Sequence, residues 1–326
     1  MPAPVAKLLV VCGQTGTGKT SLAFYLADIL GGELVSADSR QVFKKLDIGT
    51  GKDLLKSSRY DRKGFYDVGG IKIWGYDLVD PKREFSVGRY LKFAQKAIKD
   101  ITRVKKLPIL VGGTGLYIKG VVDGIPTAFV PRNPVLRKNL ERKTPEALFE
   151  ILAQLDPIRA GSLNQSDKAN PRRLIRGIEI ASWSMEKTHK PLKILAPKKA
   201  RSVLFIGLTV PKDVLAARID KRVAQRVKQG LELEIKKLLM LGVKWQHQSM
   251  SSLGYRQWRD YFLGTRTRKE AIDSWRNEEK RYAKRQLTWF KKDKRICWFD
   301  ISKEDYVKNV EEMVKKWYNT KRDQKS

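Results

Sequence analysis

The chain has 326 residues, and its 67 lysines and arginines outnumber its 35 aspartates and glutamates, which gives a formal net charge of +32. An enzyme of small metabolites needs no such excess, whereas a protein that covers a polyanion gains affinity from each phosphate it neutralises. We therefore expect a nucleic acid as partner, and no membrane, because the sequence has no long apolar run. The alternative is a basic surface that only keeps the protein soluble, a purpose that acidic residues serve better.

The few cysteines and histidines argue against a disulfide and against a zinc site. Cys12 and Cys297 stand in apolar, strand-like runs and are expected in the core. His189 and His247 have no cysteine or histidine neighbour at ligand spacing, so no zinc site is predicted. The apolar N-terminal run leads straight into a glycine-rich loop and is not a signal peptide, which favours the cytoplasm.

A phosphate-binding loop lies near the N-terminus. Residues 7–11 predict a buried strand, residues 21–30 have helical periodicity, and the sequence between them fits G-x-x-x-x-G-K-[ST]. Such a loop points successive N–H groups into one cavity and binds a di- or triphosphate, with Lys19 on the outer phosphate and the Thr20 hydroxyl on Mg²⁺. The predicted phosphate ligands are Gly13, Gln14, Thr15, Gly16, Thr17, Gly18, Lys19 and Thr20.

Strands and helices alternate through the first third of the chain. The predicted elements are strands at 33–37, 71–76 and 107–111 and a helix from its cap Ser86 to about residue 104. This alternation predicts an α/β fold, a P-loop core with a mostly parallel sheet flanked by helices, and a ligand at the carboxyl ends of the strands. Asp38 and Thr114 follow two of these strands and are expected beside the loop.

Asp38 is the acidic residue at a strand end that faces the predicted phosphate site, where a carboxylate suits a general base. Its alternatives are helix capping and an indirect role at Mg²⁺. Thr114, between glycines, either donates a hydrogen bond to a substrate or only forms a tight turn. The strand at 107–111 runs into glycine without the carboxylate of a nucleotide hydrolase, which weakens an ATPase assignment but leaves a kinase open.

A helical insertion is predicted from residue 126 to 199, where strand signals vanish and prolines separate short helical stretches. The core is thus predicted in two parts, 1–125 and 200–326. Arg172, Arg173 and Arg176 of the insertion are expected to bind RNA phosphates.

The last third returns to core elements. We predict strands at 203–208 and 296–299, and helices from Pro211, at 275–292 and at the end of the chain, with Ala283, Leu287 and Phe290 on one apolar face. The helix after Pro211 carries Arg218, Arg222 and Arg226 on one face. The first two either clamp phosphates opposite the loop or face solvent. Five aromatic residues interleaved with Arg256 and Arg259 either stack on an unpaired base or pack in the core: Trp245, Tyr255, Trp258, Tyr261 and Phe262.

Several motifs resemble the bacterial tRNA dimethylallyltransferase family. They are Asp38-Ser39-Arg40-Gln41-Val42-Phe43, Asp47-Ile48-Gly49-Thr50-Gly51-Lys52, Gly112-Gly113-Thr114-Gly115-Leu116-Tyr117, Leu253-Gly254-Tyr255-Arg256-Gln257 and the run from Arg281 to Phe290. They occur in the family's order over nearly the whole chain. The resemblance implies a P-loop core with a helical insertion. It also implies transfer of a dimethylallyl group from its diphosphate to N6 of the adenosine 3′ of the tRNA anticodon.

The resemblance implies roles that agree with the residue patterns. The loop and Mg²⁺ would hold dimethylallyl diphosphate, and Asp38 would deprotonate the N6 amine; the catalytic candidates are Asp38, Thr114, Arg218 and Arg222. The implied contacts with the tRNA anticodon stem-loop are Asp38, Ser39, Arg40, Gln41, Thr114, Arg172, Arg173, Leu174, Ile175, Arg176, Ser251, Ser252, Leu253, Gly254, Tyr255 and Arg256. The target adenosine must leave its stack. We expect a monomer.

Three segments depart from the family's pattern, and three other functions compete. Gln14 replaces a proline that is frequent after the first loop glycine, Gly75-Tyr76-Asp77 replaces a His-His pair, and Ala169-Asn170-Pro171 replaces Asn-Asp-Pro. The competitors are a prenyltransferase of free adenine nucleotides, a small-molecule kinase and a non-catalytic RNA-binding protein. The net charge and the basic, aromatic-rich last third favour tRNA.

Overall fold

The computed structural model describes residues 7–52, 54, 57–185 and 202–320. Contacts within the chain divide it into two compact units, one of residues 1–123 with 197–326 and one of residues 124–196. We call the first the core unit and the second the helical unit. The tRNA-binding role predicted for residues 126–199 stays a prediction, and His189 lies outside the described residues.

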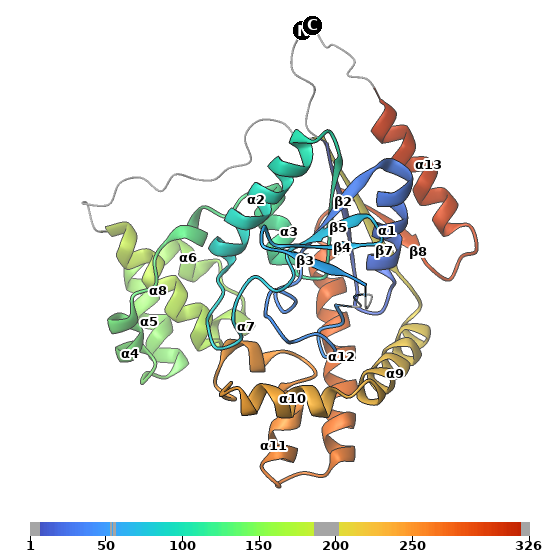
Figure 1. The fold of residues 1–326 in the computed structure, drawn as a ribbon. Helices are drawn as coiled ribbons and strands as arrows, with labels where there is room; N and C mark the ends of the chain where they lie inside the picture. Colours follow the sequence, from blue (N-terminus) through green and yellow to red (C-terminus); the bar gives the residue numbers. More distant parts are fainter. Residues whose placement is uncertain (1–6, 53, 55–56, 186–201, 321–326) are drawn as a thin grey trace, which may run out of the picture. The chain divides into compact units, whose positions relative to one another are not determined.

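The core unit is built on an eight-stranded sheet (Figure 1). Its strands are β1 Lys7–Gly13, β2 Gly32–Ser36, β3 Arg59–Asp61, β4 Phe65–Val68, β5 Ile71–Trp74, β6 Leu107–Val111, β7 Ser202–Thr209 and β8 Ile296–Asp300. Their order is β3-β4-β5-β2-β6-β1-β7-β8, with antiparallel pairing only at β3-β4 and β4-β5. The predicted mostly parallel α/β fold is confirmed. Because β2, β6 and β1 are neighbours, the loops after them meet at one edge of the sheet.

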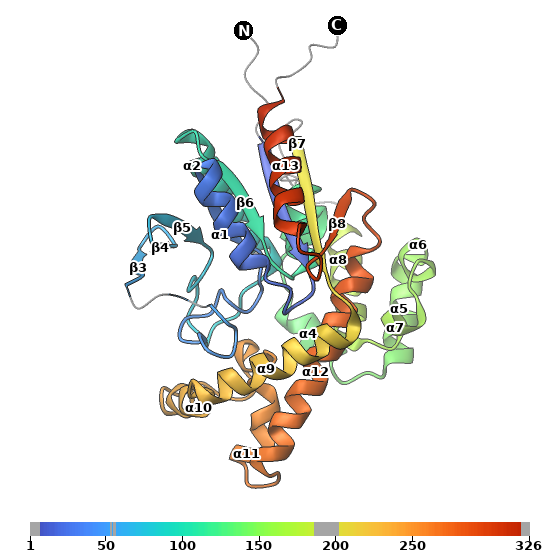
Figure 2. The ribbon, with the colours of Figure 1, turned by 90° about the vertical axis from the view of Figure 1, so that its right-hand side faces the viewer.

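Helices cover the sheet on both faces. The helices of the core unit are α1 Lys19–Leu30, α2 Val87–Arg103, α3 Gly115–Val122, α9 Lys212–Lys228, α10 Leu231–Met240, α11 Arg259–Phe262, α12 Arg268–Phe290 and α13 Tyr306–Asn319. Helices α1 and α13 lie on one face of the sheet (Figure 2), and their side chains form a cluster with Leu9 and Val11 of β1. Cys12 is buried in β1 and burial raises the pKa of its thiol to about 12, whereas Cys297 in β8 is half-buried.

A second hydrophobic cluster joins α9, α10 and α12, which lie below the sheet in the view of Figure 1. Tyr255 and Trp258 are completely buried in this cluster, and Trp245, Tyr261 and Phe262 pack against it. The alternative that these five aromatic residues form an open base-stacking platform is therefore wrong for Tyr255 and Trp258. Their large apolar rings contribute more by burial than by exposure.

The long helix predicted at 275–292 begins earlier, at Arg268. Its start is fixed by a capping box in which the Thr267 hydroxyl accepts from the Glu270 N–H and the Glu270 carboxylate accepts from the Thr267 N–H. Of the three residues predicted to share an apolar face, Ala283 and Phe290 are buried and Leu287 is half-buried. The helix predicted to begin after Ser86 is confirmed, since the Ser86 hydroxyl accepts from Arg89 N.

All regular structure between residues 124 and 185 is helical. The helices are α4 Pro134–Leu140, α5 Pro145–Leu155, α6 Pro157–Gly161, α7 Gln165–Lys168 and α8 Pro171–Met185, after a 3₁₀ turn at Pro126–Phe129. Proline opens four of these helices, because the first helical position needs no N–H donor. Leucines and isoleucines from α4, α5 and α8 form a small separate core.

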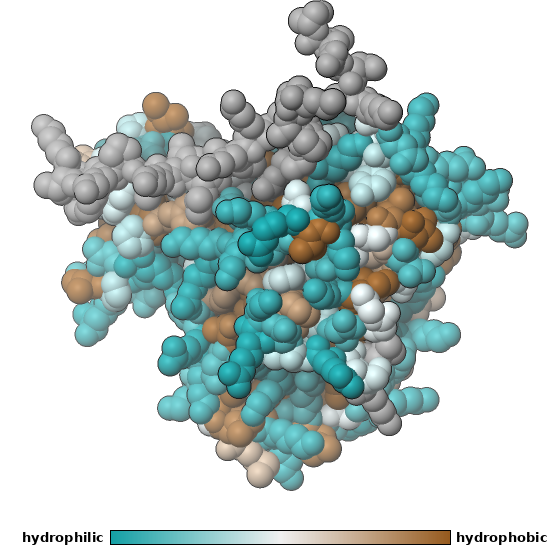
Figure 3. All heavy atoms as spheres, turned by 45° about the horizontal axis from the view of Figure 1, so that its top comes forward, coloured by the Kyte–Doolittle hydropathy of each residue, from teal (hydrophilic) through white to brown (hydrophobic). Residues whose placement is uncertain are grey.

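Hydrophilic side chains predominate on the face shown in Figure 3, and hydrophobic ones appear there in small separate patches. Within the described residues, no helix combines the length and the apolar character needed to cross a bilayer.

Candidate active site

The phosphate-binding loop connects the carboxyl end of β1 to α1. Gly13 has φ of +131°, and a Cβ there would lie 2.3 Å from the carbonyl oxygen of Leu208, so the turn requires glycine. The Thr17 hydroxyl and Lys19 Nζ both donate to the Gln14 carbonyl oxygen, at 2.8 and 2.6 Å. The loop thus closes around the N-terminus of α1, where backbone N–H groups attract anions.

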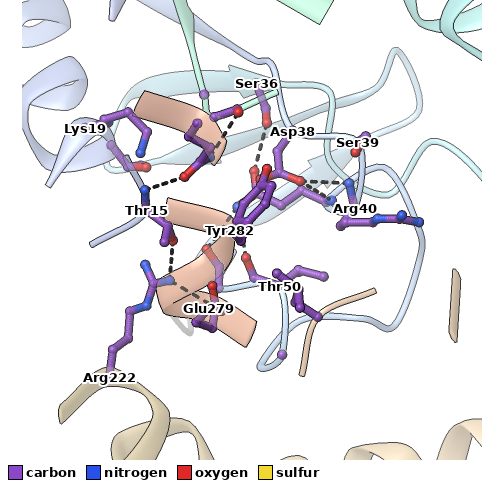
Figure 4. Close-up of a pocket in the computed structure, with 18 of the residues that line it drawn as sticks. Thr15, Lys19, Ser36, Asp38, Ser39, Arg40, Thr50, Arg222, Glu279 and Tyr282 are labelled. Carbon is purple, nitrogen blue, oxygen red and sulfur yellow. Dashed lines mark hydrogen bonds and ion pairs between the residues drawn. The ribbon is translucent and has the colours of Figure 1, made fainter. Parts of the chain in front are cut away.

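A cavity of about 400 Å³ opens beside this loop (Figure 4). Its wall combines the phosphate-binding loop, the turns after β2 and β6, residues 49–51 and side chains of α9 and α12. Figure 4 shows Lys19, Thr15 and Arg222 on one side and Asp38, Ser39 and Arg40 on the other. The lining residues include predicted and unpredicted ones: Thr15, Lys19, Thr20, Asp38, Ser39, Arg40, Gln41, Gly112, Gly113, Arg222, Arg226, Ser251, Leu253, Arg256, Glu279, Tyr282, Arg285 and Gln286.

Asp38 stands in the turn after β2 and lines the cavity. Its Oδ1 accepts from the N–H groups of Arg40 at 2.7 Å and Gln41 at 3.4 Å, which fixes the carboxylate in a tight turn. Tyr282 of α12 lies beside it, and burial first, then the charge of Asp38, raises the pKa of the Tyr282 phenol. A fixed carboxylate that faces a phosphate-binding loop can accept a proton from a substrate held between them.

Lys19 carries an ammonium group whose pKa is lowered to about 8. Burial is the main cause, and the neighbouring guanidinium of Arg222 adds to it, whereas Asp38, Cys12 and Glu279 act in the opposite direction. The site therefore holds cations close together, as a binding site for a polyanion requires.

The arginines of α9 have different surroundings. Arg222 lines the cavity and donates through Nη2 to the Thr15 hydroxyl, while its Nε is buried without a hydrogen-bond partner among the described residues. Arg218 is exposed, donates to the Gly16 carbonyl oxygen at 2.9 Å and is not among the residues that line the cavity. Of the two arginines predicted to clamp phosphates, Arg222 has the suitable position.

Thr114 caps α3 and does not line the cavity. Its hydroxyl accepts from Ser39 N at 3.1 Å, and its own N–H donates to the Ala37 carbonyl oxygen at 3.1 Å. The structure thus ties Thr114 to the Asp38 turn, which matches the tight-turn alternative better than contact with a substrate.

Two polar residues of α12 belong to the site although sequence patterns gave them no role. Gln286 is buried, accepts from Thr15 N at 2.7 Å and donates to the Gly113 carbonyl oxygen at 3.0 Å. A Cβ on Gly113 would lie 2.1 Å from Gln286 Nε2, so this glycine allows the helix to approach. Glu279 is buried between arginines. The sequence feature that could have identified Gln286 is its position inside a family motif. No such feature marked Glu279.

The segment Ser251–Arg256 contributes to the cavity only in part. Ser251, Leu253 and Arg256 line it. The prediction of RNA contacts is wrong for the side chains of Ser252 and Tyr255, because both are buried and the Tyr255 hydroxyl donates to Glu234 at 2.6 Å. Gly254 is also buried.

In the helical unit, the segment predicted to contact RNA, residues 172–176, lies on α8, and some of its side chains are buried while others are exposed. Leu174 is 0% exposed and Ile175 4%, so the prediction that they touch RNA is wrong for their side chains. Arg172 and Arg173 are exposed, although Arg173 pairs with Asp167. Arg176 donates to Glu179 and to the carbonyl oxygens of Thr127 and Val130, at 2.8 to 3.0 Å. Arg176 therefore stabilises its own unit, whereas Arg172 and Arg173 are exposed at its surface.

We expect Arg176→Ala to destabilise the helical unit by about 2 kcal/mol, because Glu179 is buried and would lose one of the guanidinium groups that satisfy it. Although burial raises the pKa of Glu179, hydrogen bonds from Arg137, Asn133 and Arg176 hold it at about 2, which shows how strongly the pairing favours the carboxylate. Calorimetric unfolding of the full chain measures the change. Arg172→Ala is the matched control and should leave the transition in place; equal shifts in both variants would contradict the assignment.

Two departures from the family pattern have structural explanations. Asp77 pairs with Lys52 at 2.5 Å and accepts from the Tyr66 hydroxyl at 2.6 Å, so it holds the segment that ends at Lys52. Gln14 is buried and donates to the Ala283 carbonyl oxygen at 3.3 Å, so it joins the phosphate-binding loop to α12.

Comparisons with known proteins agree on one family. A family model described as IPP transferase matches residues 41–293. The chain is 38% identical over 296 residues to the tRNA dimethylallyltransferase of Anoxybacillus flavithermus, covering 91% of each protein. It is 36% identical over 317 residues to that of Carboxydothermus hydrogenoformans, covering 94% of this chain and 96% of the relative.

Solved structures give the same result. The full-length tRNA isopentenylpyrophosphate transferase of Bacillus halodurans is 33% identical, with a TM-score of 0.68 over 95% of this chain and 96% of that one. A eukaryotic dimethylallyltransferase acting on tRNA is 24% identical and shares the fold, with a TM-score of 0.76 over 98% of this chain and 81% of that one.

Proposed function

Because the chain belongs to the tRNA dimethylallyltransferase family, we propose that it transfers a dimethylallyl group from dimethylallyl diphosphate to N6 of the adenosine 3′ of the anticodon, and releases diphosphate. The observation that carries the residue assignment is the arrangement of the cavity, in which Asp38 faces Lys19 and Arg222. A proton acceptor and a polyphosphate site on opposite sides of one cavity suit an amine that attacks an allylic carbon.

The diphosphate would bind to the amides of residues 13–20, to Lys19 and to Arg222. Arg222 is preferred to Arg218 because its buried Nε is still without a partner among the described residues and can donate to a phosphate oxygen. Negative charge grows on the diphosphate as its bond to the allylic carbon breaks. Cations fixed beside the departing oxygens stabilise that charge more in the transition state than in the ground state.

The residues present are compatible with Mg²⁺. Thr20 and Asp38 line the same cavity. Among the described residues, no group of three or more His, Cys, Asp and Glu side chains could hold a metal ion on its own, so the ion would need the oxygens of the bound diphosphate. Mg²⁺ keeps waters and substrate phosphates as ligands and needs few from the protein. The Thr20 hydroxyl would hold Mg²⁺ together with the diphosphate, and the ion would supply positive charge for the leaving group.

Asp38 would accept the proton of the N6 amine, and the Asp38 turn would face the RNA through Ser39, Arg40 and Gln41. Ser251, Leu253 and Arg256 line the same cavity and would contact the nucleotides beside the extruded adenosine. Arg172 and Arg173 of the helical unit would bind RNA phosphates. We further propose a cytoplasmic monomer.

The test is mass spectrometry of an anticodon stem-loop RNA incubated with the protein, Mg²⁺ and dimethylallyl diphosphate. We expect a prenyl-sized mass gain on the adenosine 3′ of the anticodon, and none in an RNA that carries guanosine there. Parallel reactions contain AMP, or ATP in place of dimethylallyl diphosphate. Prenylated AMP with unmodified RNA would indicate a free-nucleotide prenyltransferase, and phosphate transfer from ATP would indicate a kinase.

A further inference from the structure

A buried carboxylate, Glu279 of α12, lines the cavity beside the residues proposed to bind diphosphate. Its side chain is 5% exposed, and its Oε1 lies 3.6 Å from Arg222 Nη2 and 3.7 Å from Arg226 Nη1. The indole N–H of the buried Trp275 donates to the same oxygen at 3.3 Å. One carboxylate oxygen is thus shared by two guanidinium groups, and the chemistry described above makes no use of it.

The two arginines reach different walls of the cavity. Arg222 donates to the Thr15 hydroxyl in the phosphate-binding loop. Arg226, one turn later on α9, donates to the Gly49 carbonyl oxygen at 3.0 Å. Because both guanidinium groups approach Glu279, this residue holds the arginine-bearing side of α9 toward the cavity.

The charges around the cavity give Glu279 a second effect. Lys19, Arg222 and Arg226 all border the cavity, and among these neighbours Arg222 lowers the pKa of Lys19 while Glu279 raises it. A carboxylate in this position reduces repulsion among the cations when no anion is bound. It also repels any diphosphate that takes its place beside Arg222.

We propose that Glu279 is a positioning residue that holds the Arg222 guanidinium at the phosphate-binding loop and competes with diphosphate for it. Ground-state affinity for diphosphate is thereby limited, and the product leaves faster. The inference rests on the proposed function in taking diphosphate as the ligand.

The test uses inorganic diphosphate with Mg²⁺ and the full chain. Glu279→Gln keeps the shape and removes the charge, and it should tighten diphosphate binding about tenfold, with a comparably slower dissociation rate, because a repulsive charge at short range is lost. Glu279→Asp keeps the charge and should bind diphosphate nearly as the unmodified protein does. Calorimetry gives the affinity, and stopped-flow displacement gives the dissociation rate.

The matched control is Asp220→Asn. Asp220 forms another ion pair between α9 and α12, with Lys280 at 2.8 Å, and it does not line the cavity. Its loss should leave diphosphate affinity within about twofold. Unchanged or weaker diphosphate binding in folded Glu279→Gln would overturn the proposal, because a purely structural carboxylate can only loosen the site when its charge is removed.

The binding experiment needs neither RNA nor a prenyl group, so its failure is distinct from failure of the proposed function. If the unmodified protein prenylates RNA and Glu279→Gln binds diphosphate no more tightly, only the proposed role of Glu279 is contradicted. If Glu279→Gln binds diphosphate more tightly and RNA is not prenylated, only the proposed reaction is contradicted.

Discussion

Asp38→Asn is expected to lower the rate of prenyl transfer by about 10²- to 10⁴-fold and to leave tRNA affinity nearly unchanged. The structure explains why asparagine is the informative replacement. Asp38 Oδ1 accepts from Arg40 N and Gln41 N, and the amide oxygen of asparagine can accept from the same groups. The turn then survives, and only the capacity to take up a proton is lost.

Single-turnover rates at saturating RNA measure the chemical step, and RNA binding is measured separately. Asp80→Asn is the control, since Asp80 Oδ1 likewise accepts a backbone N–H, from Lys82 at 2.8 Å, but stands outside the cavity. A turnover of Asp38→Asn close to that of Asp80→Asn would leave Asp38 as a turn-forming residue and would remove the base from the proposed mechanism.

The central strands β1 and β6 were predictable because each contains a continuous apolar run, as in residues 8–11 and 107–111. The antiparallel strands β3 and β4 were missed, since β3 is short, polar and largely exposed. The start of α12 could have been predicted, because Thr267 followed by Glu270 is a capping-box pattern. Hydrophobic periodicity alone placed the helix start at residue 275, seven positions beyond Arg268.

Some residues of the candidate site could be predicted from local sequence, and others depend on tertiary packing. The phosphate-binding loop and Asp38 were predictable because local sequence defines a loop and a strand end. Gln286 and Glu279 were not, because polar residues on a helix are expected to face solvent. Gln286 turns inward because α12 packs against the turns after β1 and β6, and Glu279 because α12 packs beside the arginines of α9; both are contacts between segments far apart in the chain. Tyr255, whose motif suggested contact with RNA, is buried in the cluster that joins α9, α10 and α12.

Residues 172–176 of α8 show that a role implied by a family motif does not apply to every residue in the motif. Consecutive residues of a helix point in different directions, so a run such as Arg172–Arg176 cannot face RNA as a whole. Leu174 and Ile175 supply the core of the helical unit, while Arg176 satisfies Glu179. The family motif indicates a stretch of chain there, and side-chain exposure leaves Arg172 and Arg173 as its candidates for RNA contact.

Lys19→Ala is expected to abolish the use of dimethylallyl diphosphate and to change tRNA affinity by less than about threefold, because it removes one cation among many. Lys19 lines the cavity and closes the loop by donating to the Gln14 carbonyl oxygen at 2.6 Å. Binding of diphosphate and of RNA is measured on the same variant. Equal loss of both would mean that the phosphate-binding loop contacts RNA directly.

The pH dependence of diphosphate affinity provides an independent readout of the same residue. The free Lys19 ammonium has a pKa of about 8, and a bound anion favours its charged form. Below that pH, Lys19 is already protonated and contributes fully; above it, binding must first take up a proton. Affinity of the unmodified protein relative to Lys19→Ala should therefore fall about tenfold between pH 7 and 9. The ratio cancels the ionisation of diphosphate itself, which affects both proteins equally. A ratio that stays constant over this range would show that the lysine does not titrate there, and that burial and Arg222 do not lower its pKa as the geometry implies.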